Sequence, residues 1–230
     1  MSAISQTELT PEKFQRRKAM QAVSEKSYSK IFVPNNSGAM RFKFESGNKR
    51  RRLTDDEFWD FCRQNDEMRI EMTREGDVII MPPTGSETGE RNAEITTQLR
   101  IWAKKDKRGK TYDSSTGFKL PNGATVSPDA SWVLNERLEK FTARQREKFL
   151  PLCPDFVIEL RSASDSLKDS QNKMAEYIEN GARLGWLIDP KNRRVHAYRG
   201  NGEVEILENP DKVSGEGVLE NFELDLTEIW

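Results

Sequence analysis

Two acidic side chains stand in or beside predicted strands, where a carboxylate is unusual. Asp129 comes directly before the apolar stretch 130–133, and Glu159 interrupts the apolar run 156–160. A buried carboxylate is costly unless it is paired or binds a metal. Two carboxylates on neighbouring strands suit Mg²⁺, which prefers hard oxygen ligands and keeps several waters for a phosphate and a nucleophile. We expect Asp129, Glu159 and the backbone carbonyl of Leu160 to hold such an ion.

A cation beside this metal would orient the attacking water or offset the charge that develops on a phosphoryl group. Arg161 lies two residues after Glu159, so the strand period places both side chains on one face. Lys173, on the helix that follows, is the alternative, because lysine can both position water and lose a proton whereas arginine cannot. The sequence therefore predicts a catalytic role for Arg161 or Lys173.

Each of these residues also has a purely structural explanation. Asp129 follows a proline and can cap a turn, Glu159 and Arg161 can form a same-face ion pair, and Asp169 and Lys173 fit a helical i,i+4 pair. Together these explanations still leave unexplained why two apolar strands each carry an acid.

The stretch 154–190 positions these groups. It reads as a buried strand over 156–160, a helix with apolar residues at helical spacing that ends at Asn180-Gly181, and a second buried strand over 186–188. Because no hairpin fits between the strands, we expect a right-handed parallel crossover.

Further elements are expected on both sides of this unit. They are a helix over 54–64 opened by the capping box Thr54-Asp55-Asp56-Glu57, a hairpin of 68–72 and 78–81, a helix over 90–105, strands within 112–120 and 125–133, a helix over 136–150, and a hairpin of 195–198 and 204–207. The apolar residues between 222 and 229 then close the core.

Composition limits the organisation of the chain. With 230 residues, 35% hydrophobic and 33% charged, it fits one globular domain and a polar extension. We place the extension at residues 1–52, with a flexible link at 34–38, and the domain at 53–230. The formal net charge of −1 requires that any polyanion be met by a local patch. Basic residues cluster at 49–52 and at 104–110, and either cluster could contact phosphates. A solvated charge run is the commoner explanation for the first cluster, and cations at a helix C-terminus are the simple explanation for the second.

Cysteine and histidine usage excludes several classes of site. Cys62 and Cys153 have no metal-type or redox spacing, and His196 is the single histidine, which argues against a histidine-based metal site or hydrolase. No signal peptide or long apolar stretch is evident, so we expect a cytoplasmic protein without a membrane partner.

Several motifs together resemble the bacterial Uma-type family, whose members are predicted restriction endonucleases within the PD-(D/E)XK nuclease superfamily. The motifs are Ser127-Pro128-Asp129, Pro154-Asp155-Phe156-Val157-Ile158-Glu159-Leu160-Arg161-Ser162, Lys173-Met174-x-x-Tyr177, Gly181-x-x-x-Gly185-Trp186-Leu187-Ile188-Asp189-Pro190 and Gly76-x-x-Ile79-x-Met81-x-Pro83. The resemblance extends from about Leu53 to the C-terminus. It implies an α/β fold with a restriction-endonuclease-like mixed β-sheet flanked by helices.

The resemblance also assigns site residues. It implies that Asp129 and Glu159 are ligands of Mg²⁺, with Mn²⁺ as a substitute. The family places a lysine at the position of Arg161 or displaced onto the helix, which favours Lys173 and makes Arg161 a departure.

A second departure lies at the start of the first core helix. Many members of the family carry a histidine there, where this chain has Asn92, and Glu90 or Glu94 could substitute.

We therefore expect a magnesium-dependent endonuclease that hydrolyses phosphodiester bonds in nucleic acid, with DNA as the expected substrate. A single site cuts one strand, so cleavage of both strands would imply a homodimer. Two alternatives stay open. A nucleic-acid-binding domain without catalysis is suggested by Arg161 and Asn92, and a protein-interaction domain is permitted by the near-neutral charge.

Overall fold

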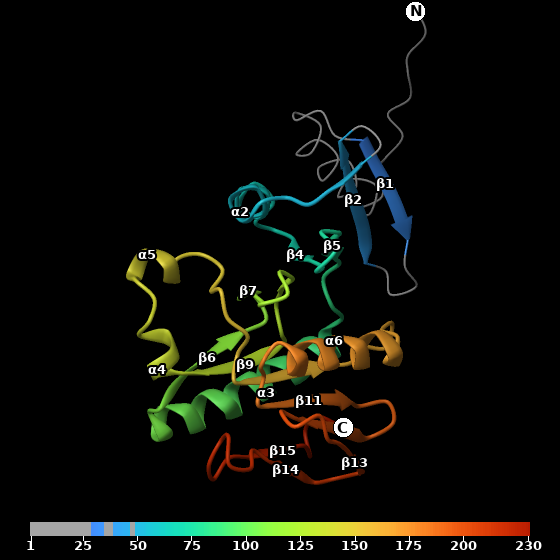
Figure 1. Ribbon diagram of the computed structural model, residues 1–230. Helices are drawn as coiled ribbons and strands as arrows, with labels where there is room; N and C mark the ends of the chain where they lie inside the picture. The colour runs from blue at the N-terminus through green and yellow to red at the C-terminus, as the bar shows by residue number, and fades with distance from the viewer. Residues whose placement is uncertain (1–28, 35–38, 47–48) are drawn as a thin grey trace, which may run out of the picture.

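The computed structural model describes residues 29–34, 39–46 and 49–230, which form two large sheets, a small third sheet and helices around them (Figure 1). One large sheet has the order β1-β2-β5-β4-β8-β7, with β3 paired to β2. The other has the order β13-β12-β11-β10-β9-β6 and mixes one parallel pair with antiparallel pairs. The predicted α/β class with a mixed sheet flanked by helices is confirmed.

The strands of the first sheet are β1 (Ser29–Pro34), β2 (Met40–Ser46), β3 (Lys49–Arg51), β4 (Arg69–Met72), β5 (Val78–Met81), β7 (Phe118–Lys119) and β8 (Thr125–Val126). Those of the second are β6 (Gly109–Asp113), β9 (Ala130–Leu134), β10 (Phe156–Leu160), β11 (Leu184–Asp189), β12 (Arg194–Arg199) and β13 (Val204–Glu208), and β14 (Lys212–Ser214) pairs with β15 (Glu223–Asp225). The helices are α2 (Asp55–Arg63), α3 (Ser86–Asp106), α4 (Asn135–Leu138), α5 (Ala143–Arg146) and α6 (Leu167–Glu179).

The predicted parallel crossover consists of β10, α6 and β11. All five residues of β10 and all six of β11 are buried, and the two strands run parallel with Phe156 opposite Leu184. Helix α6 begins after Ser166, whose hydroxyl accepts from the amide of Asp169, and it is followed by Gly181 with a φ of +102°. The helix ends there because an ordinary side chain is strained in that left-handed conformation.

The two faces of β10 pack against different layers. Phe156, Ile158 and Leu160 join a core formed with α3 and the C-terminal segment. Val157 joins a core with α6, which contributes Met174 and other apolar residues. Because side chains alternate along a strand, Glu159 shares the α6 side of the sheet with Val157.

The first sheet includes residues that the sequence analysis assigned to the extension. Strand β2 pairs with β5, and Met40, Phe42 and Phe44 are buried beside Phe58 of α2. Their spacing of two residues is that of a half-buried strand, and the intervening basic residues made the stretch read as polar. Residues 1–28 and most of the predicted link at 34–38 lie outside the described residues.

Other local predictions hold or need correction. The hairpin of β4 and β5 and the capping box at Thr54 are confirmed. The stretch 125–133 divides at Pro128 into β8 and β9, which belong to different sheets, and 112–120 divides in the same way into β6 and β7. The long helix predicted over 136–150 is wrong, because only the short helices α4 and α5 form there. In the part of the chain that the structure describes, no helix has the length and apolar character needed to cross a membrane.

Candidate active site

Strands β9 and β10 bring the two predicted carboxylates to the same end of the second sheet. Ala130 pairs with Ile158 across the two strands, so Asp129 and Glu159 are the next residues along in register. Asp129 accepts a hydrogen bond from the amide of Leu160 through Oδ2 at 2.8 Å. Both side chains are buried, with 7% and 9% of the residue exposed. The structure thus places two acids side by side in a setting where each needs a partner.

Glu159 finds its partners on helix α6. Its Oε1 accepts from the hydroxyl of Tyr177 at 2.8 Å and lies 3.0 Å from Nζ of Lys173. Tyr177 and Lys173 are four residues apart, so one helix face presents both. Burial raises the pKa of Glu159 to about 7, although the ammonium of Lys173 acts in the opposite direction.

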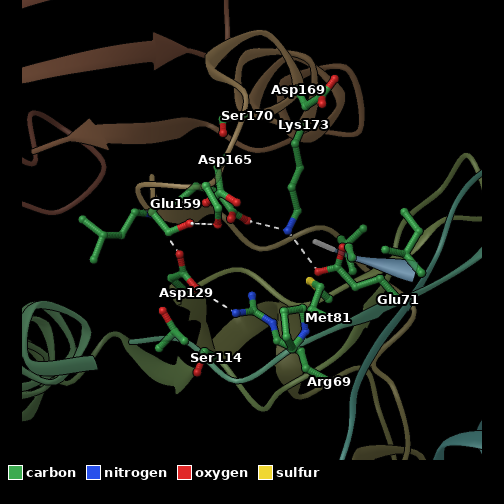
Figure 2. A pocket seen from close by; sticks show the side chains of 18 of the residues that line it. Arg69, Glu71, Met81, Ser114, Asp129, Glu159, Asp165, Asp169, Ser170 and Lys173 are labelled. Atoms are coloured by element: carbon green, nitrogen blue, oxygen red, sulfur yellow. Dashed lines mark hydrogen bonds and ion pairs between the residues drawn. The ribbon is translucent and has the colours of Figure 1, made fainter. Parts of the chain in front are cut away.

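Lys173 lies between two carboxylates. Its Nζ is 3.0 Å from Oε1 of Glu159 and 3.0 Å from Oε1 of Glu71. Figure 2 shows the ammonium between the two acids. Burial lowers the pKa of Lys173, but the two carboxylates more than compensate, so the net shift is upward. The ammonium therefore stays charged at neutral pH.

Strand β4 supplies two further site residues, Arg69 and Glu71, that the sequence analysis missed. Nη1 of Arg69 donates to Oδ1 of Asp129 at 3.0 Å, and the same guanidinium donates to the carbonyl of Ser127. Glu71, with 6% of the residue exposed, accepts from the amide of Ser127 at 2.8 Å. The alternation of charged and apolar residues in β4 was interpreted only as a hairpin strand. The signal that could have found these residues is the spacing of two that places both on one face.

These groups line one pocket of about 1460 Å³. Its walls are the β4–β5 hairpin, the start of α3, the 162–166 loop and α6, and Figure 2 shows part of the lining. Asp129, Glu159, Leu160 and Lys173 all line it, together with Asn92 of α3. Oδ1 of Asn92 is buried and has no hydrogen-bond partner among the described residues. Four of the predicted site residues therefore meet in a single cavity, together with Asn92, which stands where many members of the resembled family carry a histidine.

A comparison with protein-family models identifies the relationship. Residues 55–227 match Uma2, described as "Putative restriction endonuclease". The chain belongs to the Uma2 family. No curated protein matches it.

Among solved structures, this Uma2 member is similar to a putative nuclease belonging to DUF820 from Anabaena variabilis. The TM-score is 0.62 at 21% identity, over 77% of this chain and 97% of that chain. At this identity the likeness shows a shared fold alone. The resemblance noted in the sequence is thus confirmed at the level of family and fold.

The structure distinguishes between Arg161 and Lys173, the two cations that the sequence predicted for this site. Nη1 of Arg161 lies 3.0 and 3.1 Å from the two carboxylate oxygens of the fully buried Asp189, and its Nε donates to the carbonyl of Asp165. Arg161 is not among the described residues that line the pocket. Neither an Arg161–Glu159 pair nor the i,i+4 pair of Asp169 with Lys173 is found in the described part of the chain. Of the two cations, Lys173 is the one that lies in the pocket beside Glu159.

The donor atoms at Asp129 and Glu159 fit a hard divalent cation. The hydrogen bond from Tyr177 and the 3.0 Å contact with Lys173 both engage Oε1 of Glu159. The amide of Leu160 points toward Asp129, and the carbonyl of an extended residue points to the same side as its amide, so the Leu160 carbonyl also faces Asp129. No group of three or more His, Cys, Asp or Glu side chains within the described ranges is arranged around a metal position. Two carboxylates and one carbonyl match the few protein ligands that Mg²⁺ takes when waters complete its shell.

Proposed function

We propose that this chain is an endonuclease that hydrolyses phosphodiester bonds in nucleic acid, with DNA as the expected substrate and Mg²⁺, or Mn²⁺ in its place, as cofactor. One observation carries the proposal. The buried carboxylates of Asp129 and Glu159 lie at adjacent strand positions beside the ammonium of Lys173, in a pocket large enough for a nucleotide. The Uma2 match and the nuclease-like fold support the same reaction class.

Each side chain has a distinct task in this proposal. Asp129, Glu159 and the carbonyl of Leu160 would hold the metal ion. When bound, Mg²⁺ lowers the pKa of a coordinated water and neutralises phosphate charge. Tyr177 orients the Glu159 carboxylate by donating to Oε1, which leaves Oε2 directed to other partners. Lys173 stays protonated, so it stabilises negative charge on the phosphoryl oxygens and does not remove a proton from water.

A specific observation favours a second candidate, a nucleic-acid-binding or protein-interaction domain without catalysis. Arg69 already neutralises Asp129, and Lys173 already neutralises Glu159. Three carboxylates, including Glu71, thus face two cations inside the protein. A site in which each carboxylate has a cationic partner could persist for structural reasons. Metal-dependent cleavage is the property that separates the two candidates.

The test is cleavage of supercoiled plasmid, linear duplex DNA and single-stranded RNA, each with Mg²⁺, with Mn²⁺ and with a chelator. We expect cleavage by the wild type with either metal and none with the chelator. Asp129→Asn and Lys173→Met should each reduce the rate by at least about a hundredfold, the scale of losing one electrostatic stabiliser. Glu147→Gln, at the exposed C-cap of helix α5, is the matched control. Metal-independent cleavage, or variants as active as the control, would contradict the proposal.

The products also report on assembly. A homodimer with two-fold symmetry would present one site to each strand of a duplex. We expect linear plasmid to form directly from the supercoiled form if the active species is such a dimer, and nicked circles to accumulate first if it is a monomer. Sedimentation at the assay concentration checks which species is present.

A further inference from the structure

Strand β4 reaches into the site from a different sheet. Arg69 and Glu71 are two residues apart, so both side chains project from the same face. They make three contacts beside the second sheet: with the side chain of Asp129 and the backbone of Ser127, both in the segment between β8 and β9, and with Lys173 of α6. The hairpin thus forms a wall of the site, although the predicted chemistry used none of its residues.

Glu71 is held at both of its contacts through one atom. Oε1 accepts from the amide of Ser127 at 2.8 Å and from Nζ of Lys173 at 3.0 Å. Ser127 lies two residues before Asp129, so this oxygen links the ammonium of the helix to the segment that carries the predicted metal ligand. Lys173 also contacts Glu159, which lies opposite that segment. The contacts therefore form a continuous chain from Ser127 through Glu71 and Lys173 to Glu159.

The burial of Glu71 is not explained by stability. Both carboxylates contact the same nitrogen at 3.0 Å, so Oε1 of Glu71 and Oε1 of Glu159 are no more than about 6 Å apart. Two like charges at that separation repel in a buried site. Replacing buried ionic groups by well-packed apolar residues is often neutral or stabilising. Because the repulsion between the two buried carboxylates works against folding, we look for a role of Glu71 in the site.

We propose that Glu71 is a positioning residue that holds the Lys173 ammonium at a fixed place between β4 and β10, away from the side of Glu159 that faces Asp129. The inference rests on the proposed nuclease function of the same site. With Glu71 in place, the ammonium has two anionic partners and is shared between them. Without it, Glu159 is the nearest carboxylate to Lys173, and the ammonium then competes with a divalent cation for that group.

Glu71→Gln tests this directly, because glutamine keeps an oxygen for the amide of Ser127 and removes the charge that holds Lys173. Glu147→Gln is the matched control, since it makes the same change of side chain at an exposed position outside the pocket. We expect the magnesium dissociation constant, measured by calorimetry without nucleic acid, to rise about tenfold in Glu71→Gln, the scale of one partly buried charge interaction. kcat should fall by a similar factor while KM for nucleic acid stays within about twofold. Glu147→Gln should change neither.

A third variant and a spectroscopic signal keep the inference falsifiable. Glu71→Asp retains the charge, so we expect it to recover magnesium affinity to within about threefold of the wild type. The ¹⁵N signal of the Lys173 ammonium should be sharp in the wild type, where two carboxylates hold it, and exchange-broadened in Glu71→Gln. A purely structural role for Glu71 would lower thermal stability and leave these readouts unchanged.

The outcomes distinguish this inference from the proposed function. Magnesium affinity and kcat in Glu71→Gln equal to those of Glu147→Gln would overturn the positioning role while leaving the nuclease intact. A wild type that binds no magnesium and cleaves nothing would overturn the nuclease proposal. In that case the ammonium signal still decides whether Glu71 holds Lys173, and an unchanged signal in Glu71→Gln would refute it.

Discussion

Replacing Glu159 by glutamine should stabilise the protein in a pH-dependent manner. Burial raises the pKa of the folded Glu159 carboxyl to about 7, against an ordinary value of 4.5. The folded state therefore retains this proton over a pH range in which the unfolded state has lost it. The free energy of unfolding consequently falls as pH rises from about 4.5 to about 7. Above pH 7 the full cost of ionising the buried acid is present in the wild type and absent from Glu159→Gln.

The magnitude follows from the two pKa values. A difference of about 2.5 units corresponds to about 3 kcal/mol, since each unit contributes about 1.4 kcal/mol. Most of this difference develops between pH 5 and pH 8. Glutamine can still accept from Tyr177, and Lys173 stays protonated throughout the range, so changes in those contacts contribute equally at every pH.

Urea unfolding of both proteins at pH 5, 6, 7 and 8 without metal measures the effect. The quantity to plot is the free energy of unfolding of Glu159→Gln minus that of the wild type, because other titrating groups such as His196 cancel in the difference. We expect it to rise by about 2 to 3 kcal/mol across the range. Glu147→Gln, at an exposed position, should give a flat line. A flat or falling line for Glu159→Gln would refute the inference that burial dominates this carboxyl.

Three further predictions concern the metal, the second sheet and its packing. Because a proton competes with the cation at Glu159, magnesium affinity measured by calorimetry should fall about tenfold for each pH unit below about 7, and a pH-independent affinity would exclude this carboxylate as a ligand. Arg161→Met leaves the buried carboxylate of Asp189 without its cation, so the free energy of unfolding measured in urea should fall by about 3 kcal/mol while magnesium affinity is retained. A folded variant that no longer binds magnesium would show that Arg161 belongs to the metal site. Gly185→Ala places a Cβ 2.5 Å from Cε of Met174 and 3.1 Å from Cγ2 of Val157, so it should lower the free energy of unfolding by about 1 kcal/mol in the same assay. An unchanged midpoint would show that the Met174 side chain moves aside without cost.

The sequence predicted best where a local pattern determines the structure. The unit of β10, α6 and β11 was predicted because apolar runs, helical spacing and the stop at Asn180-Gly181 lie within 35 residues of one another. The capping box at Thr54 is equally local. Asp129 and Glu159 were identified because a carboxylate in an apolar strand is conspicuous, and register then placed them side by side.

The division of the chain into two large sheets was not predictable in the same way. Strands β8 and β9 are separated by three residues, and only their distant partners determine that they enter different sheets. Strand β2 was hidden because Arg41 and Lys43 alternate with its buried residues and lower the apparent hydrophobicity of the stretch. Both differences arise from long-range pairing, which a local pattern does not encode.

Glu71 and Arg69 show the same limit within the site. Each looks like an ordinary polar residue of a hairpin, and each becomes a site residue only because α6 and the 127–129 segment cover that face of β4. The position of Lys173 between two acids likewise depends on Glu71, which is 102 residues away in sequence. Arg161 shows the converse, because its place two residues after Glu159 suggested the site while its actual partner, Asp189, lies on the adjacent strand.

We propose above that Asp129 and Glu159 together bind the divalent cation of a nuclease. The most direct test is calorimetric titration of Mg²⁺ into the wild type, Asp129→Asn and Glu159→Gln at pH 8, with the same samples then incubated with supercoiled plasmid. We predict one site per chain in the wild type, loss of binding in both variants, and nicking only where binding is retained. Magnesium binding that survives both substitutions, or nicking that does not depend on them, would contradict a metal site at Asp129 and Glu159.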